Sequence, residues 1–92
     1  MIASFKHRGL KRFFEDDDPR KLPADMVARI RAILARLHQA EVLEELNVHS
    51  YKLHPLKGSR SGEWGITVRA NWRITFRFEA GYAVDVNFED YH

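Results

Sequence analysis

Residues 64–88 read WGITVRANWRITFRFEAGYAVDVNF, and this stretch decides the fold class. Apolar and polar side chains alternate through three segments of it, and a period of two is typical of strands with one buried face. Residues 69–71 and 79–81 separate the segments, and each connection ends in Asn or Gly, which tolerate the left-handed backbone of short hairpin loops. The stretch therefore predicts two successive hairpins, which together form a three-stranded antiparallel sheet.

One register places the apolar side chains of all three strands on the same face of the sheet. In this register Val68 faces Trp72 across the first hairpin, and Phe78 faces Tyr82 across the second. The opposite, polar face then holds two rows of side chains: Thr67, Arg73 and Asn87 in one, and Gly65, Thr75 and Asp85 in the other. Residues 51–54 also alternate, and they are expected to add Lys52 and His54 to the polar face.

Before residue 50 the apolar period is that of a helix. The repeat is clearest in four residues that share a face, with Pro23 and Asp25 suited to the first turn: Met26, Ile30, Ile33 and Leu37. Shorter helical segments are expected around residues 10–14 and 42–46, and a short first strand at residues 2–5. We predict an α+β fold, with N-terminal helices packed on one face of a mainly antiparallel sheet, in a single domain of residues 1–92.

The composition narrows the class of protein. The chain of 92 residues has no cysteine, which excludes a disulfide framework and any thiolate metal site. Its longest apolar run, residues 32–35, is too short to cross a bilayer, so we expect a cytoplasmic protein that does not enter the membrane. Residues 48–78 contain six Lys or Arg against Glu63 alone. Such a segment fits a polyanion, or is simply the solvated basic face of an ordinary domain.

The polar face carries the residues best suited to chemistry. Arg73 and Arg77, with Lys57 in a nearby turn, would offer cations to phosphate groups, unless the two arginines pair with Asp85 across the strands. Two histidines near these cations, His54 and His92, are what phosphodiester cleavage without a metal needs, because one group accepts a proton and another donates one.

The C-terminal residues admit two interpretations. Tyr91 is suited to stacking on an exposed base, and His92 to proton transfer. The alternative is a frayed terminus that exposes both. The sequence contains no paired metal-ligand spacing, so we expect neither a metal nor another cofactor.

Three blocks of the sequence resemble the HigB toxins, a group within the RelE/ParE superfamily of type II toxin–antitoxin modules. They are YKLHPLKG at residues 51–58, ITVRANWRITF at residues 66–76, and EDYH at residues 89–92. The resemblance also covers the opening residues 2–10. It implies a compact RelE-like fold in which helices pack on one face of a small curved antiparallel sheet.

The resemblance further implies an endonuclease that cleaves translated mRNA in the ribosomal A site, without a metal, through attack of a 2′-hydroxyl group, and so inhibits translation. The implied catalytic residues are His54, Asp90, Tyr91 and His92. The implied phosphate-binding residues are Lys57 and Arg73, with Lys52, Arg69 and Arg77 as possible additional RNA contacts.

The implied partners are a HigA-type antitoxin with a helix-turn-helix, the ribosome with its RNA, and mRNA. The free toxin is expected to be a monomer that forms a hetero-oligomer with the antitoxin. Two alternatives stay open: a ParE-like inhibitor of DNA gyrase, which the superfamily fold alone permits, and a catalytically silent protein that binds the antitoxin or RNA.

Overall fold

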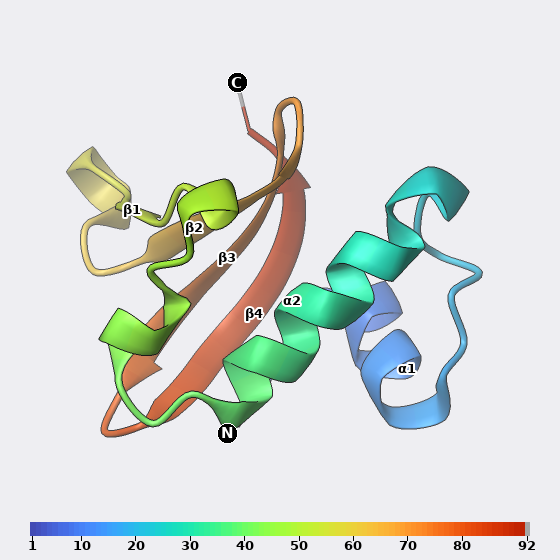
Figure 1. The fold of residues 1–92 in the computed structure, drawn as a ribbon, viewed down its shortest axis with the longest axis horizontal. Coiled ribbons are helices and arrows are strands. Elements are labelled where there is room, and N and C mark those ends of the chain that lie inside the picture. Colours follow the sequence, from blue (N-terminus) through green and yellow to red (C-terminus); the bar gives the residue numbers. More distant parts are fainter. Residues whose placement is uncertain (92) are drawn as a thin grey trace.

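The computed structural model describes residues 1–91, and its architecture is α+β. The helices are α1 (Arg8–Asp16) and α2 (Val27–Gln39), and the strands are β1 (His54–Pro55), β2 (Trp64–Arg69), β3 (Trp72–Glu79) and β4 (Tyr82–Asp90). Four 3₁₀ turns lie between them: η1 (Ala24–Met26), η2 (Leu43–Leu46), η3 (His49–Tyr51) and η4 (Gly58–Arg60). Both α-helices lie on one side of the twisted sheet, which confirms the predicted fold class (Figure 1).

The four strands are antiparallel neighbours in the order β1-β2-β3-β4. The strand expected at residues 2–5 is reduced to two isolated parallel bridges, from Ile2 to Ala83 and from Phe5 to Val86. The backbone of this segment runs along β4, where the Ala3 amide donates to the Ala83 carbonyl at 2.8 Å. The N-terminal segment therefore covers the free edge of the sheet.

The first hairpin has the predicted register along most of its length. Pairs run from Trp64 opposite Phe76 to Thr67 opposite Arg73. At the tip a register shift places Arg69, rather than Val68, opposite Trp72. Ala70 in this turn has a left-handed φ of 50°, so the connection is tighter than the three-residue loop that the sequence suggested.

The register predicted for the second hairpin is wrong. Its turn has two residues, Ala80 (φ 51°) and Gly81 (φ 85°), so Tyr82 faces Glu79 instead of Phe78. Positive φ at both positions is the geometry that suits tight hairpins. A second shift follows at Asp85, whose φ of 54° is typical of a β-bulge, and beyond it Phe88 faces Ile74.

The two-residue turn and the bulge together decide which side chains of β4 are inside. Ala83, Val86 and Phe88 are buried, whereas Tyr82 is 47% exposed and does not face the core as predicted. The predicted apolar face of the helix is confirmed, because its residues are almost fully buried in the core. They are Ile30, Ile33, Leu34 and Leu37 of α2, and they are buried together with the strand residues Ile66, Ile74 and Phe76.

Arg29 ties helix α2 to the end of the sheet. Its Nε donates to the Val68 carbonyl at 2.8 Å, and its Nη2 donates to the carbonyls of Ser50 at 2.7 Å and Thr67 at 3.0 Å.

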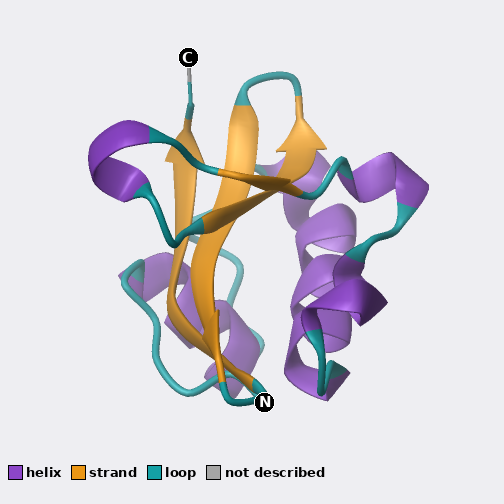
Figure 2. Cartoon of the chain, turned by 90° about the vertical axis from the view of Figure 1, so that its left-hand side faces the viewer, coloured by secondary structure: helices purple, strands orange, loops and turns teal. Residues whose placement is uncertain are grey.

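Figure 2 shows the strands from the side of the sheet that faces away from the α-helices. Within residues 1–91, no helix is long and apolar enough to cross a membrane.

Candidate functional site

The pairing of the strands defines a polar face, which is the sheet surface opposite α1 and α2. One row on it runs His54–Gly65–Thr75–Asn87, from β1 to β4, and the next runs Thr67–Arg73–Glu89. The predicted register places Asn87 beside Arg73, but the two-residue turn and the bulge at Asp85 together place Glu89 there. Thr75 is only 1% exposed, so the middle of the polar face is closed to solvent.

His54 is half-buried at the start of β1, and its ring has a defined orientation. Nδ1 lies 2.8 Å from the Lys52 carbonyl oxygen. Because a carbonyl oxygen only accepts hydrogen bonds, Nδ1 carries the hydrogen, and Nε2 of the neutral ring keeps its lone pair. The ring lies against Gly65, where a β-carbon would stand 3.1 Å from Nε2. This arrangement presents Nε2 as a proton acceptor on the polar face.

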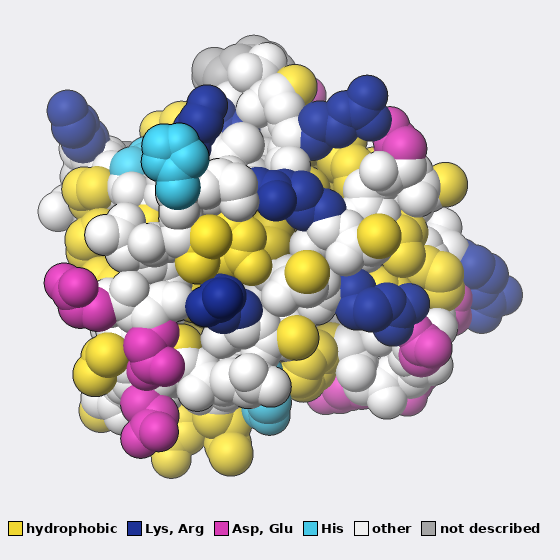
Figure 3. All heavy atoms as spheres, in the orientation of Figure 1, with side chains coloured by type: hydrophobic (Ala, Val, Ile, Leu, Met, Phe, Trp, Pro, Cys, Tyr) yellow, Lys and Arg dark blue, Asp and Glu magenta, His cyan; other side chains and the backbone are white. Residues whose placement is uncertain are grey.

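The two lysines expected at the site are exposed. Lys52 has a left-handed φ of 48° and ends the turn η3, which aligns its carbonyl with His54. Lys57 directly precedes the turn η4. Figure 3 shows Lys and Arg side chains with a histidine on the upper part of one face, over β1 and the β2–β3 turn, while acidic side chains gather at its lower left, over η2.

Arg73 lies on β3 and is half-buried. Its Nη1 donates to the carbonyl oxygens of Ala70 and, at 3.2 Å, Trp72. Its Nε is buried and has no hydrogen-bond partner within the part of the chain that the structure describes. The backbone contacts hold the half-buried Arg73 guanidinium in place, so it is a fixed cation beside the exposed end of the hairpin.

The alternative that Arg73 and Arg77 pair with Asp85 is not observed among residues 1–91. Asp85 is exposed on the bulge, and its backbone amide binds Ser4 Oγ at 2.8 Å. Arg77 extends to Gly62 instead, where its Nη1 occupies the space that a β-carbon would take, 2.7 Å away. The exposed Arg69 forms an ion pair with Asp25, which neutralises part of its charge.

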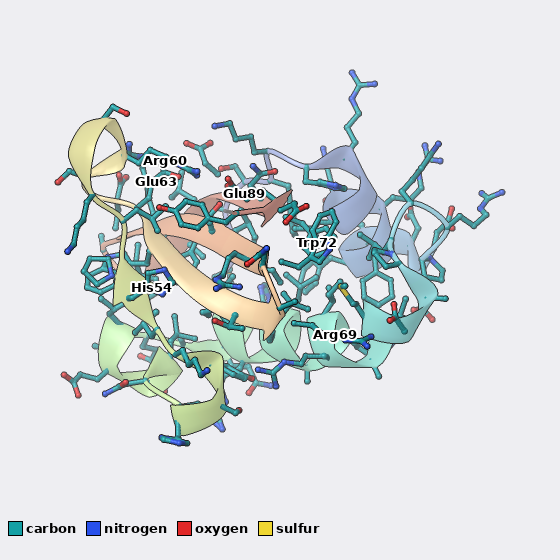
Figure 4. All side chains as sticks on the ribbon, turned by 90° about the horizontal axis from the view of Figure 1, so that it is seen from above. His54, Arg60, Glu63, Arg69, Trp72 and Glu89 are labelled. Carbon is teal, nitrogen blue, oxygen red and sulfur yellow. The ribbon has the colours of Figure 1, made fainter. Side chains whose placement is uncertain are left out.

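The strongest ionic network of the polar face, formed by Arg60, Glu63 and Glu89, was not predicted from the sequence. Arg60 of η4 donates to both carboxyl oxygens of Glu89 at 2.7 Å and to those of Glu63 at 3.1 and 2.8 Å. Figure 4 shows Arg60, Glu63 and Glu89 as one group, with Arg69 apart from it. The one available signal was Glu63, the single acid of residues 48–78, which lies three residues after Arg60.

The network keeps its carboxylates ionised. Hydrogen bonds from Arg60, with smaller contributions from Thr75 and Asn87, lower the pKa of Glu89 to about 2 against the opposing effect of burial. The hydrogen bonds from Arg60 also lower the pKa of Glu63, and those from both carboxylates raise the pKa of Arg60. Glu89 therefore acts as a fixed negative charge at neutral pH.

The chain ends next to this network. Asp90 closes β4 opposite Trp72, and the Tyr91 amide donates to the Asn71 carbonyl at 2.8 Å. Tyr91 is 38% exposed, and the Arg60 guanidinium lies 6.0 Å from the centre of its ring. The backbone is held as far as the Tyr91 amide, while the Tyr91 side chain is exposed, as the alternative of a frayed terminus expects. The expected catalytic residue His92 lies outside the described residues.

The structure brings most of the expected residues to one region, although not into a single cluster. His54 is on β1, Arg73 on β3, and Asp90 and Tyr91 at the end of β4. Strands are about 4.8 Å apart, so the β1 and β4 backbones are separated by about 14 Å. Residues 1–91 contain no group of three or more His, Cys, Asp or Glu that could hold a metal ion. The arrangement is a broad surface that suits a chain-like substrate.

Residues 3–92 match the family model described as the RelE-like toxin of the type II toxin–antitoxin system HigB. The chain is also 55% identical, over the full length of both proteins, to the Endoribonuclease HigB of Proteus vulgaris.

Two solved structures share the fold at low sequence identity. The YoeB/ParE toxin from Agrobacterium tumefaciens is 16% identical with a TM-score of 0.59, over 96% of this chain and 95% of its own. YafQ from E. coli is 13% identical with a TM-score of 0.57, over 98% of this chain and 93% of its own. At these identities the likeness concerns the fold alone, and it agrees with the α+β architecture described above.

Proposed function

The chain belongs to the family of RelE-like HigB toxins of type II toxin–antitoxin systems, and from this premise we propose that it is an endoribonuclease. The full-length relative from Proteus vulgaris carries that activity in its name. Of the residues expected at the site from this resemblance, His54 and Arg73 lie on the polar face, and Asp90 and Tyr91 lie at the C-terminal end of β4.

The observation that carries the proposal is the orientation of His54. Its Nδ1 contact with the Lys52 carbonyl leaves Nε2 able to accept a proton, on the same sheet face as the fixed cation Arg73. A base and a phosphate-binding cation on one surface are two of the groups that cleavage of a phosphodiester by internal attack needs. The basic stretch of residues 48–78 supports the same substrate class.

The proposed reaction is transfer of the phosphate to the neighbouring 2′-hydroxyl group. A base removes the proton of this hydroxyl, the 2′-oxygen bonds to phosphorus, and the bond from phosphorus to the 5′-oxygen breaks as an acid protonates that oxygen. The products are a 2′,3′-cyclic phosphate and a 5′-hydroxyl. His54 and His92 share the two proton-transfer roles, Asp90 orients a histidine, and Tyr91 positions or stacks a base. Lys57 and Arg73 hold the phosphate, and the route uses no metal.

We further propose that the substrate is mRNA in the A site of a translating ribosome, and that Lys52, Arg69 and Arg77 add RNA contacts. A surface spread over four strands and lined with cations suits a nucleic acid that another assembly holds extended. A type II toxin has an antitoxin partner, and we propose that here it is a HigA-type protein with a helix-turn-helix.

The test is induction of the protein in cells, followed by mapping of new mRNA 5′ ends. Wild-type protein should produce 5′-hydroxyl ends inside translated codons, and His54→Ala and His92→Ala should each abolish most of them. His49→Ala, at an exposed histidine of η3, is the matched control and should cleave as the wild type does. A parallel reaction with purified ribosomes and a chelator tests the metal-free route.

The other outcomes separate the alternatives. Arrested growth with intact messages would contradict the nuclease proposal and favour inhibition of gyrase. Normal growth with intact messages would leave a silent binding protein. If free RNA were cleaved at the same rate as ribosome-bound mRNA, only the proposed dependence on the ribosome would be contradicted, and the nuclease proposal would stand.

A further inference from the structure

Arg60 connects two segments that are far apart in the sequence. Four of its five N–H donors are used, two on Glu63 and two on Glu89, which lies 29 residues further along the chain. The side chain of Arg60 is 30% exposed, and those of Glu63 and Glu89 are 17% and 22% exposed. A forked contact to two carboxylates fixes the guanidinium in position and in orientation, which a lysine at this place would not do.

Glu89 is held from its other side as well. Thr75 Oγ1 donates to its Oε2 at 2.6 Å, and Asn87 Nδ2 donates to the same oxygen at 3.3 Å. Both donors come from the polar face, so the carboxylate is fixed to the sheet and Arg60 is fixed to the carboxylate. With four donors on its two oxygens, Glu89 has little capacity left to accept a proton from a substrate.

The two connected segments carry the expected chemistry. Arg60 ends the segment that begins with His54 and contains Lys57, and Glu89 immediately precedes Asp90 and Tyr91. The guanidinium also lies 6.0 Å from the centre of the Tyr91 ring. His54 and Tyr91 are otherwise related only through the width of the sheet, because β1 is two residues long and pairs with β2 alone.

We propose that Arg60 is a positioning residue, which sets the segment of residues 54–60 relative to the segment of residues 89–91 by bridging Glu63 and Glu89. The inference rests on the endoribonuclease activity proposed above. Arg60 acts through its neighbours, since its donors point at carboxylates rather than into an open site. Because small displacements of reacting groups cost about 10²-fold in rate, the effect is expected on the catalytic step.

The experiment compares Arg60→Ala with Arg20→Ala under single-turnover conditions, on ribosomes that hold an mRNA. Arg20 is the matched control, because it also forms a forked ion pair, with Asp18 at 2.9 and 2.8 Å, in an exposed loop. Arg60→Ala should lower the maximal cleavage rate by about 10–100-fold while the half-saturating toxin concentration changes by less than about threefold. Arg20→Ala should change neither.

Two further variants separate positioning from other roles. Arg60→Lys keeps the charge and loses the fork, so it should restore only part of the rate, and it serves if Arg60→Ala fails to fold. Arg60→Ala combined with Glu89→Gln should be no slower than the slower single variant, because the two residues act as one unit. Circular dichroism establishes that each variant is folded at the assay temperature.

Three other outcomes would contradict the positioning role of Arg60 or the activity on which it rests, and the measurements distinguish them. An unchanged maximal rate with a lower melting temperature would make Arg60 a stabilising contact only. A raised half-saturating concentration with an unchanged rate would make it an RNA-binding residue. Either result overturns the inference while the wild type still cleaves. Absence of cleavage by the wild type would instead overturn the proposed function on which the inference rests.

Discussion

The ring of His54 lies directly against the backbone of Gly65, on the neighbouring strand. A β-carbon at position 65 would stand 3.0 Å from Cε1 and 3.1 Å from Nε2 of the imidazole. Gly65 faces His54 in the ladder between β1 and β2, so the close approach follows directly from the pairing of the strands. The glycine is thus the surface against which the proposed base is placed.

Gly65→Ala should therefore reduce cleavage much more than stability. The added methyl group displaces the end of a side chain that can rotate away, so we expect a change of less than about 1 kcal/mol in the free energy of unfolding. The displaced Nε2 loses its alignment, and the cleavage rate should fall at least about tenfold. Rate measurements and thermal melts of the same preparations check this.

The control places the same change in a protein that already lacks the ring. In a His54→Ala background, Gly65→Ala should have no additional effect on the residual rate. A further tenfold loss there would show that Gly65 acts on the substrate or on another residue.

Arg73→Ala should also lower cleavage more than stability. Its removal deletes two bonds from Nη1 to backbone carbonyls, which would cost about 1 kcal/mol of stability, and it removes a cation from the proposed phosphate site. We expect the apparent affinity for the ribosome-bound message and the rate to fall together by about tenfold or more. A large fall in melting temperature with unchanged cleavage would identify Arg73 as structural.

The sequence predicted the elements of the fold well because each depends on a local pattern. The apolar stripe of α2 and the alternation in β2 and β3 are set by which side chains must be buried, and Ile33, Ile66 and Phe76 are indeed fully buried. The first hairpin has the predicted register from Trp64 to Thr67 for the same reason.

The second hairpin was predicted wrongly because its register depends on backbone conformation. Ala80 and Asp85 adopt a positive φ, which neither residue type prefers strongly enough to show in a sequence. The Arg60 network was missed for a related reason. Only the spacing of Arg60 and Glu63 was visible in the sequence, because Glu89 reaches Arg60 through the register of β4, which the turn and the bulge at Asp85 set.

The bulge itself can be tested at Asp85. A left-handed φ is unfavourable for a β-branched residue and free of steric cost for glycine, so Asp85→Val should destabilise the protein by about 1–2 kcal/mol, and Asp85→Gly should be neutral or slightly stabilising. For a domain of this size, 1 kcal/mol corresponds to a shift of about 4–8 °C in melting temperature. Equal melting temperatures for the two variants would contradict a bulge at this position.

The ion pair of Arg60 with Glu89 predicts how stability depends on pH. The pKa of Glu89 is lowered to about 2 in the folded protein, first by the hydrogen bonds from Arg60, whereas an unfolded glutamate titrates near 4.3. A carboxyl whose pKa is depressed on folding contributes stability that is fully present above the unfolded pKa and is lost as the pH falls toward the folded pKa. The contribution should therefore disappear between about pH 5 and pH 2.

Glu89→Gln removes this titration, and the measurement is the melting temperature of both proteins from pH 7 to pH 2. At pH 7 the variant should be less stable by about 1–3 kcal/mol, because the uncharged amide leaves Arg60 with Glu63 alone. The difference should shrink as the pH falls, since the wild type loses the same interaction by protonation. Parallel curves over the whole range would show that protonation of Glu89 is not linked to folding, which would contradict the ion pair as the source of the difference.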